Sequence, residues 1–164
     1  LSKAAQEAHA SLTGGKETLA VRYISQAAEA ENPEEELLRR LKMARSEDLR
    51  RMTTTVGIHR DDIGVTINGK EARTYASQGQ QRSAVLSLKL AQLEMAARET
   101  GEAPILMLDD VMSELDDYRR RFLIQMVKKY QIQTIITGAN IELLTDEMAE
   151  NEIFWVQEGK IITK

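Results

Sequence analysis

The sequence predicts an α/β protein with a parallel sheet that is flanked by helices and β-hairpins. After Pro104, stretches typical of strands and helices alternate at lengths that fit right-handed crossovers between parallel strands. The run "ILMLDD" from Ile105 is apolar up to its two carboxylates, which is typical of a strand buried on both faces. The pair Asn68-Gly69, between two alternating stretches, indicates a hairpin turn.

The composition bounds the class of protein. With 164 residues, 42% of them hydrophobic, the chain is long enough to build one domain with its own core. Its 22 basic and 26 acidic residues leave a net charge of -4, which argues against binding nucleic acid over the whole surface but leaves room for a local basic patch. The sequence has no apolar run near the ~18 residues of a membrane span, no secretory core and no cysteine. We therefore expect a soluble cytoplasmic protein, and the start at Leu1, inside a helical pattern, indicates a piece of something longer.

The first predicted elements are a helix end over residues 1–11, a break at Thr13–Gly15 and a strand in "ETLAVRYIS". The break includes "TGGKET", which invites comparison with a phosphate-binding loop. That motif requires Lys followed directly by Ser or Thr, between a strand and a helix. Here Glu17 follows Lys16 and the predicted order is helix, turn, strand, so we reject a phosphate-binding loop at this position.

The next helix begins after Asn32, an N-cap residue, with Pro33 in its first position and acidic residues in its first turn. Four leucines give this helix an apolar side: Leu37, Leu38, Leu41 and Leu49. Its many basic residues are Arg39, Arg40, Lys42, Arg45, Arg50 and Arg51. They can bind DNA or form a solvated face paired with the acidic residues, and we favour the paired face because such pairs are common on helices.

Strands predicted in "TTTVGI" and "IGVTI" flank the stretch "HRDD", residues 59–62. His59 can contact a metal or a nucleotide, but no second histidine is near, so we favour an ion-paired turn. A long helix is then expected over residues 78–98, with Ser77 as its cap and Gly101 past its end.

The last third of the chain completes the alternation of strands and helices. We expect a helix over residues 117–130, a strand in "IQTIIT", a helix near 141–149 and a closing hairpin in "IFWVQEGKIIT", with Phe154 and Trp155 packed under it. Basic residues on the first of these helices can touch DNA, but we favour a solvated face in an acidic chain. They are Arg119, Arg120, Arg121, Lys128 and Lys129.

Two carboxylates, Asp109 and Asp110, follow the apolar strand at its carboxyl end, the edge where open α/β sheets hold ligands. One of them can hold Mg²⁺ while its neighbour orients a water for attack. An ordinary pair of capping residues at a strand end gives the same pattern, so both interpretations stay open on this stretch alone.

The start of the long helix, "TYASQGQQ", has polar groups but no carboxylate. Gly79 allows backbone N–H groups to approach a phosphate, the helix dipole favours an anion, and Ser77 and Gln80 add donors without adding negative charge. This pattern indicates an anion-binding helix terminus. The alternative is a simple Ser cap followed by solvated glutamines.

Longer stretches around these residues resemble a known family. "ASQGQQRSAVLSLKLAQLEM" resembles the signature segment of ABC-type ATPases, with Gln78 at the usual first glycine, and "ILMLDDVMSELD" resembles a Walker B strand followed by a D-loop. Together with "GIHRDDIGVTINGKEARTYASQGQQR", they are similar to bacterial RecF, the SMC-related recombination and repair ATPases. The likeness is close over residues 50–145. It implies the C-terminal part of a P-loop ABC-type ATPase head, without the Walker A part.

The resemblance also implies roles for individual residues. The signature residues would bind the γ-phosphate of ATP held by a second subunit: Ser77, Gln78, Gly79 and Gln80. Asp109 would hold Mg²⁺, Asp110 would take the catalytic position that most ABC ATPases fill with glutamate, and Thr137 is the candidate γ-phosphate sensor where many relatives carry histidine. The D-loop at the dimer interface would consist of Ser113, Glu114, Leu115 and Asp116.

The same resemblance implies a domain division and a function. Residues 1–30 would be the end of an inserted helical domain with a linking strand, and residues 31–164 the signature and Walker B part of the head. The whole protein would be a weak DNA-dependent ATPase of the cytoplasm and nucleoid that acts in the repair of single-strand gaps and in replication restart. It would form a homodimer on ATP, bind double-stranded DNA at single-strand gaps, and work with the recombination mediator RecR and with the N-terminal part of its own head.

Two other functions are compatible with the sequence. Because it contains neither a Walker A loop nor a Q-loop, the chain by itself should not hydrolyse ATP, and it can instead be a non-catalytic module that docks on a recombination-mediator partner or on the rest of its head. An SMC-type head proper is disfavoured, since such heads emerge from long coiled coils and residues 1–52 show no sustained heptads.

Overall fold

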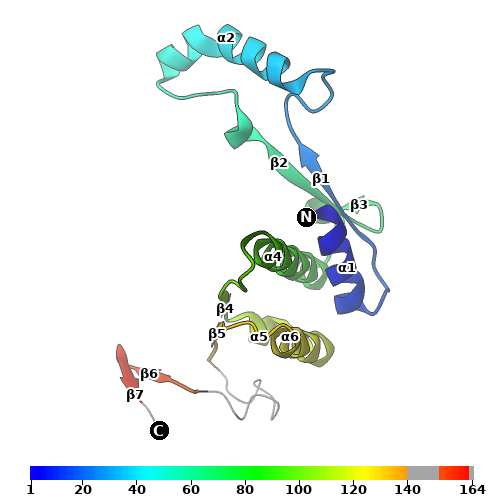
Figure 1. Cartoon of the computed structure of the whole chain (residues 1–164), viewed down its shortest axis with the longest axis vertical. Coiled ribbons are helices and arrows are strands. Elements are labelled where there is room, and N and C mark those ends of the chain that lie inside the picture. Colours follow the sequence, from blue (N-terminus) through cyan, green and yellow to red (C-terminus); the bar gives the residue numbers. More distant parts are fainter. Residues whose placement is uncertain (140–151, 163–164) are drawn as a thin grey trace. The chain divides into compact units, whose positions relative to one another are not determined.

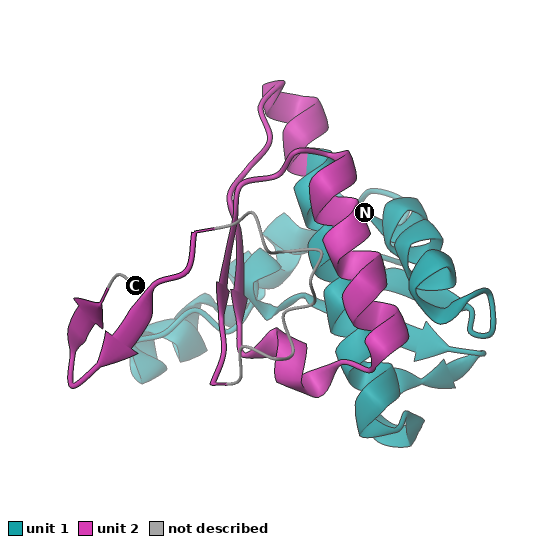
Figure 2. Ribbon diagram, turned by 90° about the horizontal axis from the view of Figure 1, so that it is seen from below, with its two compact units in different colours: residues 1–95 teal, residues 96–164 magenta. Residues whose placement is uncertain are grey.

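The computed structural model describes residues 1–139 and 152–162. The chain divides into two compact units, residues 1–95 and residues 96–164, shown in teal and magenta in Figure 2. The predicted boundary near residue 30 stays a prediction. Over the described ranges, no helix is both long enough and apolar enough to cross a membrane.

The first unit contains an antiparallel three-stranded sheet in the order β1-β2-β3. Its strands are β1 (Leu19–Ile24), β2 (Asp62–Ile67) and β3 (Lys70–Glu71). Leu19 pairs with Ile67 at one end of the β1–β2 ribbon. Asn68 and Gly69, which connect β2 to β3, have φ values of 51° and 77°, as the tight hairpin turn requires. The hairpin prediction is therefore confirmed.

Three helices of this unit share a core with the sheet. They are α1 (Ser2–Thr13), α3 (Ala72–Tyr75) and α4 (Gln78–Thr100). Helix α1 ends at Gly14, whose φ of 62° is the left-handed conformation that glycine adopts without penalty. The buried side chains of the shared core are small or aliphatic: Ala5, Leu19, Ile67, Ala72, Ala84 and Ala91. Alanines let the helices approach closely, and this packing holds the first half of α4 against α1.

Helix α2 (Pro33–Arg51) follows β1 and precedes β2 in the chain, as Figure 1 shows. The Asn32 side chain accepts a hydrogen bond from the Glu35 N–H and Pro33 begins the helix, as predicted. Glu36 forms ion pairs with Arg39 and Arg40. Glu47 forms ion pairs with Arg50 and Arg51. The prediction of a solvated face with paired charges is therefore confirmed.

The leucines of α2 contribute to no buried core. No residue of the helix is buried, Leu38 and Leu49 are 51% and 70% exposed, and Leu37 and Leu41 are half-buried. One expectation for this region is wrong. The stretch "TTTVGI" forms no strand, and the chain enters a short 3₁₀ turn, η1 (Ile58–Arg60), before β2. Its β-branched residues predicted a strand, but Gly57 has a φ of 143°, outside the β region.

The second unit is built on two parallel strands, β4 (Leu106–Asp109) and β5 (Thr134–Thr137). The helices α5 (Val111–Glu114) and α6 (Asp117–Lys129) connect them. The parallel pair confirms the predicted crossover. The prediction that β4 is buried on both faces is wrong. Leu106 and Leu108 are buried, whereas Met107 is 74% exposed, because nothing in the described part of the chain covers that face.

A hairpin of β6 (Trp155–Gln157) and β7 (Lys160–Ile162) closes the described chain, as predicted. Phe154 and Trp155 are exposed rather than packed under it, so that expectation was wrong. The helix predicted near residues 141–149 lies outside the described residues.

Candidate nucleotide site

The first turn of α4 is closed by a pair of reciprocal hydrogen bonds. The Gln80 N–H donates to Ser77 Oγ at 3.3 Å, and the Ser77 N–H donates to Gln80 Oε1 at 2.9 Å. This is a capping box, in which the cap residue and the third helical residue each satisfy the other's backbone. The spacing Ser-x-x-Gln thus fixes both where α4 begins and how its first turn is oriented.

Several donors of this turn remain available to a ligand. The N–H groups of Gln78 and Gly79 have no acceptor within the helix, as is general for a helix start. Ser77 Oγ accepts from the backbone and therefore keeps its own hydrogen to donate. Ser77, Gln78 and Gly79 are exposed, the first turn holds no acidic residue, and a Cβ on Gly79 would meet no atom within 4 Å. The turn can receive an anion.

The glutamine side chains of the turn form hydrogen bonds within the protein, whereas the sequence suggested donors available to a ligand or solvated side chains. Gln80 Nε2 donates to Glu17 Oε1 at 3.0 Å. Gln81 Nε2 donates to the carbonyl oxygens of Ala72 and Ala76, at 3.2 and 3.3 Å, and so ties α4 to the end of α3. Sequence reasoning missed Glu17, because 63 residues separate it from Gln80 and no local pattern connects the two.

In the second unit, the ends of β4 and β5 bring Asp109 and Thr137 together. They are paired in the parallel register, and the Thr137 hydroxyl donates to Asp109 Oδ1. The Asp110 N–H lies 3.2 Å from Thr137 O and 3.1 Å from Thr137 Oγ1. Three residues that the sequence singled out, two carboxylates and a hydroxyl, thus form one exposed cluster at the carboxyl edge of the sheet.

Asp110 occupies an unusual backbone conformation. Its φ of 51° and ψ of 17° are left-handed, a region that Asp enters more readily than most residues other than glycine. Asp110 stands at the N-cap of α5, but its side chain makes no cap hydrogen bond, and its carbonyl oxygen accepts from Ser113 Oγ at 2.8 Å. The carboxylate is therefore not used to start the helix.

The four residues of the expected D-loop have different environments. Ser113 and Glu114 are exposed in α5, whereas Leu115 is buried. Asp116 is the N-cap of α6, where its carboxylate accepts from the Arg119 N–H at 2.9 Å and pairs with the Arg119 guanidinium. Ser113, Glu114 and Asp116 are thus the exposed members of the set.

The donors at the edge of the sheet fit Mg²⁺. This ion prefers oxygen ligands and is usually held by one or two carboxylates, with substrate phosphates and water as its other ligands. Asp109 and Asp110 supply the carboxylates. Within residues 1–139 and 152–162 no group of three or more His, Cys, Asp or Glu side chains lies close enough together to hold a metal ion.

His59 makes a hydrogen bond rather than an ion pair in its turn. His59 Nε2 lies 3.0 Å from Thr54 O, Arg60 donates to the same oxygen at 3.3 Å, and the Tyr23 hydroxyl donates to Asp61. The turn prediction holds, but the bonds are to backbone and to a phenol instead of between charges.

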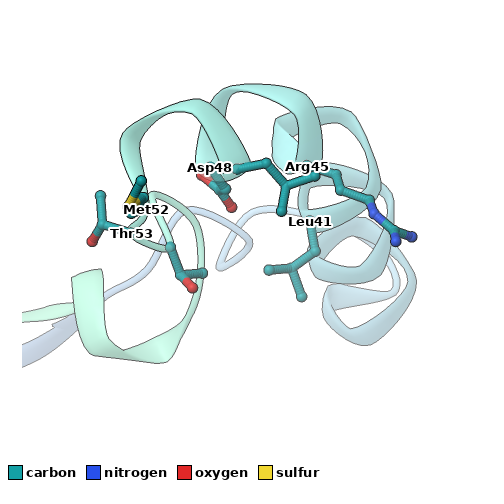
Figure 3. A pocket seen from close by; sticks show the side chains of 7 residues that line it. Leu41, Arg45, Asp48, Met52 and Thr53 are labelled. Carbon is teal, nitrogen blue, oxygen red and sulfur yellow. The ribbon is translucent and has the colours of Figure 1, made fainter.

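A pocket of about 470 Å³ lies at the C-terminal end of α2 (Figure 3). The residues that line it belong to the segment from Leu41 to Thr54. Asp48, one of its polar residues, accepts hydrogen bonds from the Thr55 N–H and hydroxyl at 3.0 and 2.6 Å. The Arg45 guanidinium points away from Asp48. The pocket therefore offers no cluster of convergent polar groups. The candidate nucleotide-binding residues are those at the start of α4, in the first unit, and those at the β4–β5 edge, in the second.

Comparison with known proteins finds homologues named RecF over nearly the whole chain. No family model matches it. It is 41% identical over 162 residues to the DNA replication and repair protein RecF of Clostridium perfringens and 44% identical over 170 residues to RecF of Symbiobacterium thermophilum. These matches cover 98% and 99% of the chain. The chain is a homologue of the C-terminal part of RecF. It spans less than half of the RecF relatives, 44% and 45% of their lengths.

Solved structures support the same assignment. Two structures described as the recombination mediator protein RecF in the RecFOR pathway, RecF-ATPrS and RecF-ATP, match with TM-scores of 0.72 and 0.70 and identities of 33% and 34%. Both matches cover 99% of this chain and 43% of the RecF chain. The Smc head domain of Pyrococcus furiosus shares the fold at 16% identity, with a TM-score of 0.54, 99% of this chain covered and 34% of the Smc chain. The predicted ABC-type head fold is thereby confirmed.

Proposed function

We propose that this chain is the signature and Walker B part of a RecF-like, ATP-dependent DNA-repair ATPase. The observation that carries the proposal is the first turn of α4, where a capping box leaves the Ser77 hydroxyl and the N–H groups of Gln78 and Gly79 open to an anion. The γ-phosphate of an ATP held by the second subunit of a homodimer contacts the four signature residues, Ser77, Gln78, Gly79 and Gln80. Hydrogen-bond donors at a helix start are suited to that group.

The edge of the β4–β5 sheet supplies the hydrolytic part of the site. Asp109 holds Mg²⁺, with Thr137 fixing the orientation of its carboxylate through the hydroxyl bond. Asp110, whose carboxylate does not cap α5, orients the attacking water. When bound, Mg²⁺ neutralises phosphate charge. Asp110 is one methylene shorter than glutamate, so we expect slow turnover.

The remaining parts of the proposal concern the whole protein. The sequence contains no Walker A loop, so the nucleotide is held by residues outside this chain and the chain alone is inactive. The D-loop of residues 113–116 lies at the dimer interface. We propose that the whole protein acts on double-stranded DNA at single-strand gaps, together with the mediator RecR, in the cytoplasm and nucleoid. The relatives are named for DNA replication and repair and the matched structures for the RecFOR pathway, which supports a role in DNA repair.

The test is Ser77→Arg in a RecF-length protein, meaning this chain preceded by the part that RecF relatives carry before the matched region. The arginine side chain fills the space that the phosphate needs, so we expect loss of ATP-dependent dimerisation, measured by light scattering with Mg²⁺, while the monomer still binds ATP. The matched control is Ser46→Arg, which makes the same change at an exposed position of α2. Normal dimerisation of the Ser77 variant would refute the signature role.

A second candidate is a non-catalytic module that docks on the mediator partner or on the rest of the head. It is favoured by the exposed apolar face of the β4–β5 sheet, where Met107 and Ile135 are 74% and 49% exposed. Such a face is unusual unless another element covers it. ATP turnover by the chain alone would contradict this candidate.

A further inference from the structure

A chain of hydrogen bonds within the first unit connects the interior of α1 to the first turn of α4. His9 of α1 is completely buried. Its Nδ1 lies 3.0 Å from Ser87 Oγ, and its Nε2 lies 3.2 Å from Glu17 Oε2. The other oxygen of Glu17 accepts from Gln80 Nε2 at 3.0 Å. Glu17 is therefore held at one oxygen by a buried histidine and at the other by a residue of the signature motif.

Counting hydrogens fixes the direction of these bonds. Ser87 Oγ donates its one hydrogen to Ser83 O at 2.7 Å, so His9 Nδ1 donates to Ser87 Oγ. A proton also lies between His9 Nε2 and Glu17 Oε2, since two bare acceptors would repel each other at 3.2 Å. The bond to the buried histidine thus holds this oxygen of the Glu17 carboxylate in place.

Glu17 in turn fixes which way the Gln80 amide faces. An ionised carboxylate only accepts hydrogen bonds, so the NH₂ group of Gln80 faces Glu17 and the amide oxygen faces the Ser77 N–H, 2.9 Å away. The reversed amide would place its oxygen against a carboxylate and its NH₂ against an N–H. The capping box that opens the Ser77 hydroxyl to a ligand therefore depends on Glu17.

The Glu17 carboxylate lies next to the turn that we propose binds a phosphate, although both groups are negatively charged. Unpaired, it would repel a phosphate at the start of α4. Glu17 is 16% exposed and hydrogen-bonded at both oxygens, which reduces that repulsion and keeps the side chain in one orientation. We propose that Glu17 is a positioning residue of the signature motif, which sets the Gln80 amide for γ-phosphate binding, and that His9 holds Glu17 in place. The inference rests on the proposed function.

The experiment is a double-mutant cycle on ATP-dependent dimerisation of the RecF-length protein. Glu17→Ala and Gln80→Ala should each weaken dimerisation by about tenfold, the usual effect of one hydrogen bond to a charged group. The double variant should be no weaker than Gln80→Ala alone, because without Gln80 the Glu17 side chain has no amide to position. ATP binding by the monomer should not change. Independent effects that multiply would overturn the proposal.

Three further variants test whether the effect on dimerisation is specific to the contacts of the Glu17 side chain. Glu7→Ala, an exposed carboxylate of the same unit, should leave dimerisation unchanged. Glu17→Gln should stay within about threefold of the parent, since its amide oxygen can accept from Gln80 while its NH₂ donates to a neutral His9. Glu17→Asp keeps the charge but is too short for both contacts, so it should weaken dimerisation, and it provides the test if Glu17→Ala does not fold.

The results separate this inference from the proposed function. If Ser77→Arg abolishes ATP-dependent dimerisation and none of the Glu17 variants weakens it, the positioning role is wrong and the signature role stands. If neither position matters, the signature role is wrong and the positioning role is wrong with it.

Discussion

At the scale of single residues, the signature turn combines an exposed glycine with side chains that are held in place. Gln80 is fixed at both ends of its amide, by Ser77 and by Glu17. Gly79, in contrast, has open space where a side chain would begin. A methyl group there is therefore harmless to the fold and harmful only to a ligand that approaches the backbone.

Gly79→Ala tests this point. Alanine is a better helix former than glycine by roughly 0.5–1 kcal/mol, so the free energy of unfolding should stay equal or rise. ATP-dependent dimerisation of the RecF-length protein should fall, since the methyl group keeps the phosphate from the N–H groups. Urea unfolding and light scattering measure the two effects. A variant that dimerises as well as the parent would contradict close approach of a phosphate at Gly79.

At the scale of elements, α2 is stabilised by its own sequence rather than by packing. Its cap at Asn32, its first-turn acids and its ion pairs are all local, and none of its residues is buried. Hydrogen bonds from Arg39 and Arg40 lower the pKa of Glu36 from its ordinary 4.5 to about 2. These two ion pairs contribute little to the stability of the helix, because the arginine side chains are exposed to solvent.

The pH dependence of α2 follows from that pKa. Because the folded pKa lies below the unfolded one, the Glu36 contribution is fully present above pH 4.5 and is lost as pH falls toward about 2. Helicity measured by circular dichroism should therefore decrease over this range, and Glu36→Gln should reduce the decrease. An unchanged pH profile in that variant would show that the two arginines do not hold Glu36.

Locally encoded elements are the ones that the sequence predicted well. The cap at Asn32, the Asn68-Gly69 turn and the start of α4 at Ser77 each depend on residues within a few positions. The contact between Glu17 and Gln80 could not be predicted, because it depends on how α1 and α4 pack. The exposure of Met107 was missed for a related reason: an apolar strand shows that it needs cover on both faces, not whether this chain supplies it.

At the scale of the whole molecule, the proposed function gives this chain some parts of a nucleotide site and not others. It has a helix start suited to phosphate, with a supporting network inside the first unit, and a carboxylate edge in the second unit. It has no Walker A loop. It matches less than half of its RecF relatives, and the apolar faces at Met107 and Leu49 are exposed. We therefore expect nucleotide binding only when the rest of a RecF head is present.

The most direct test of this account is an ATP-dependent change in molecular mass, measured by light scattering with Mg²⁺. The chain is measured alone and mixed with the RecF part that precedes the matched region. The account predicts that mass rises with ATP only in the mixture, because each ATP is held by that part and contacted by the signature turn of the opposite subunit. A rise with the chain alone, or no rise in the mixture, would contradict it.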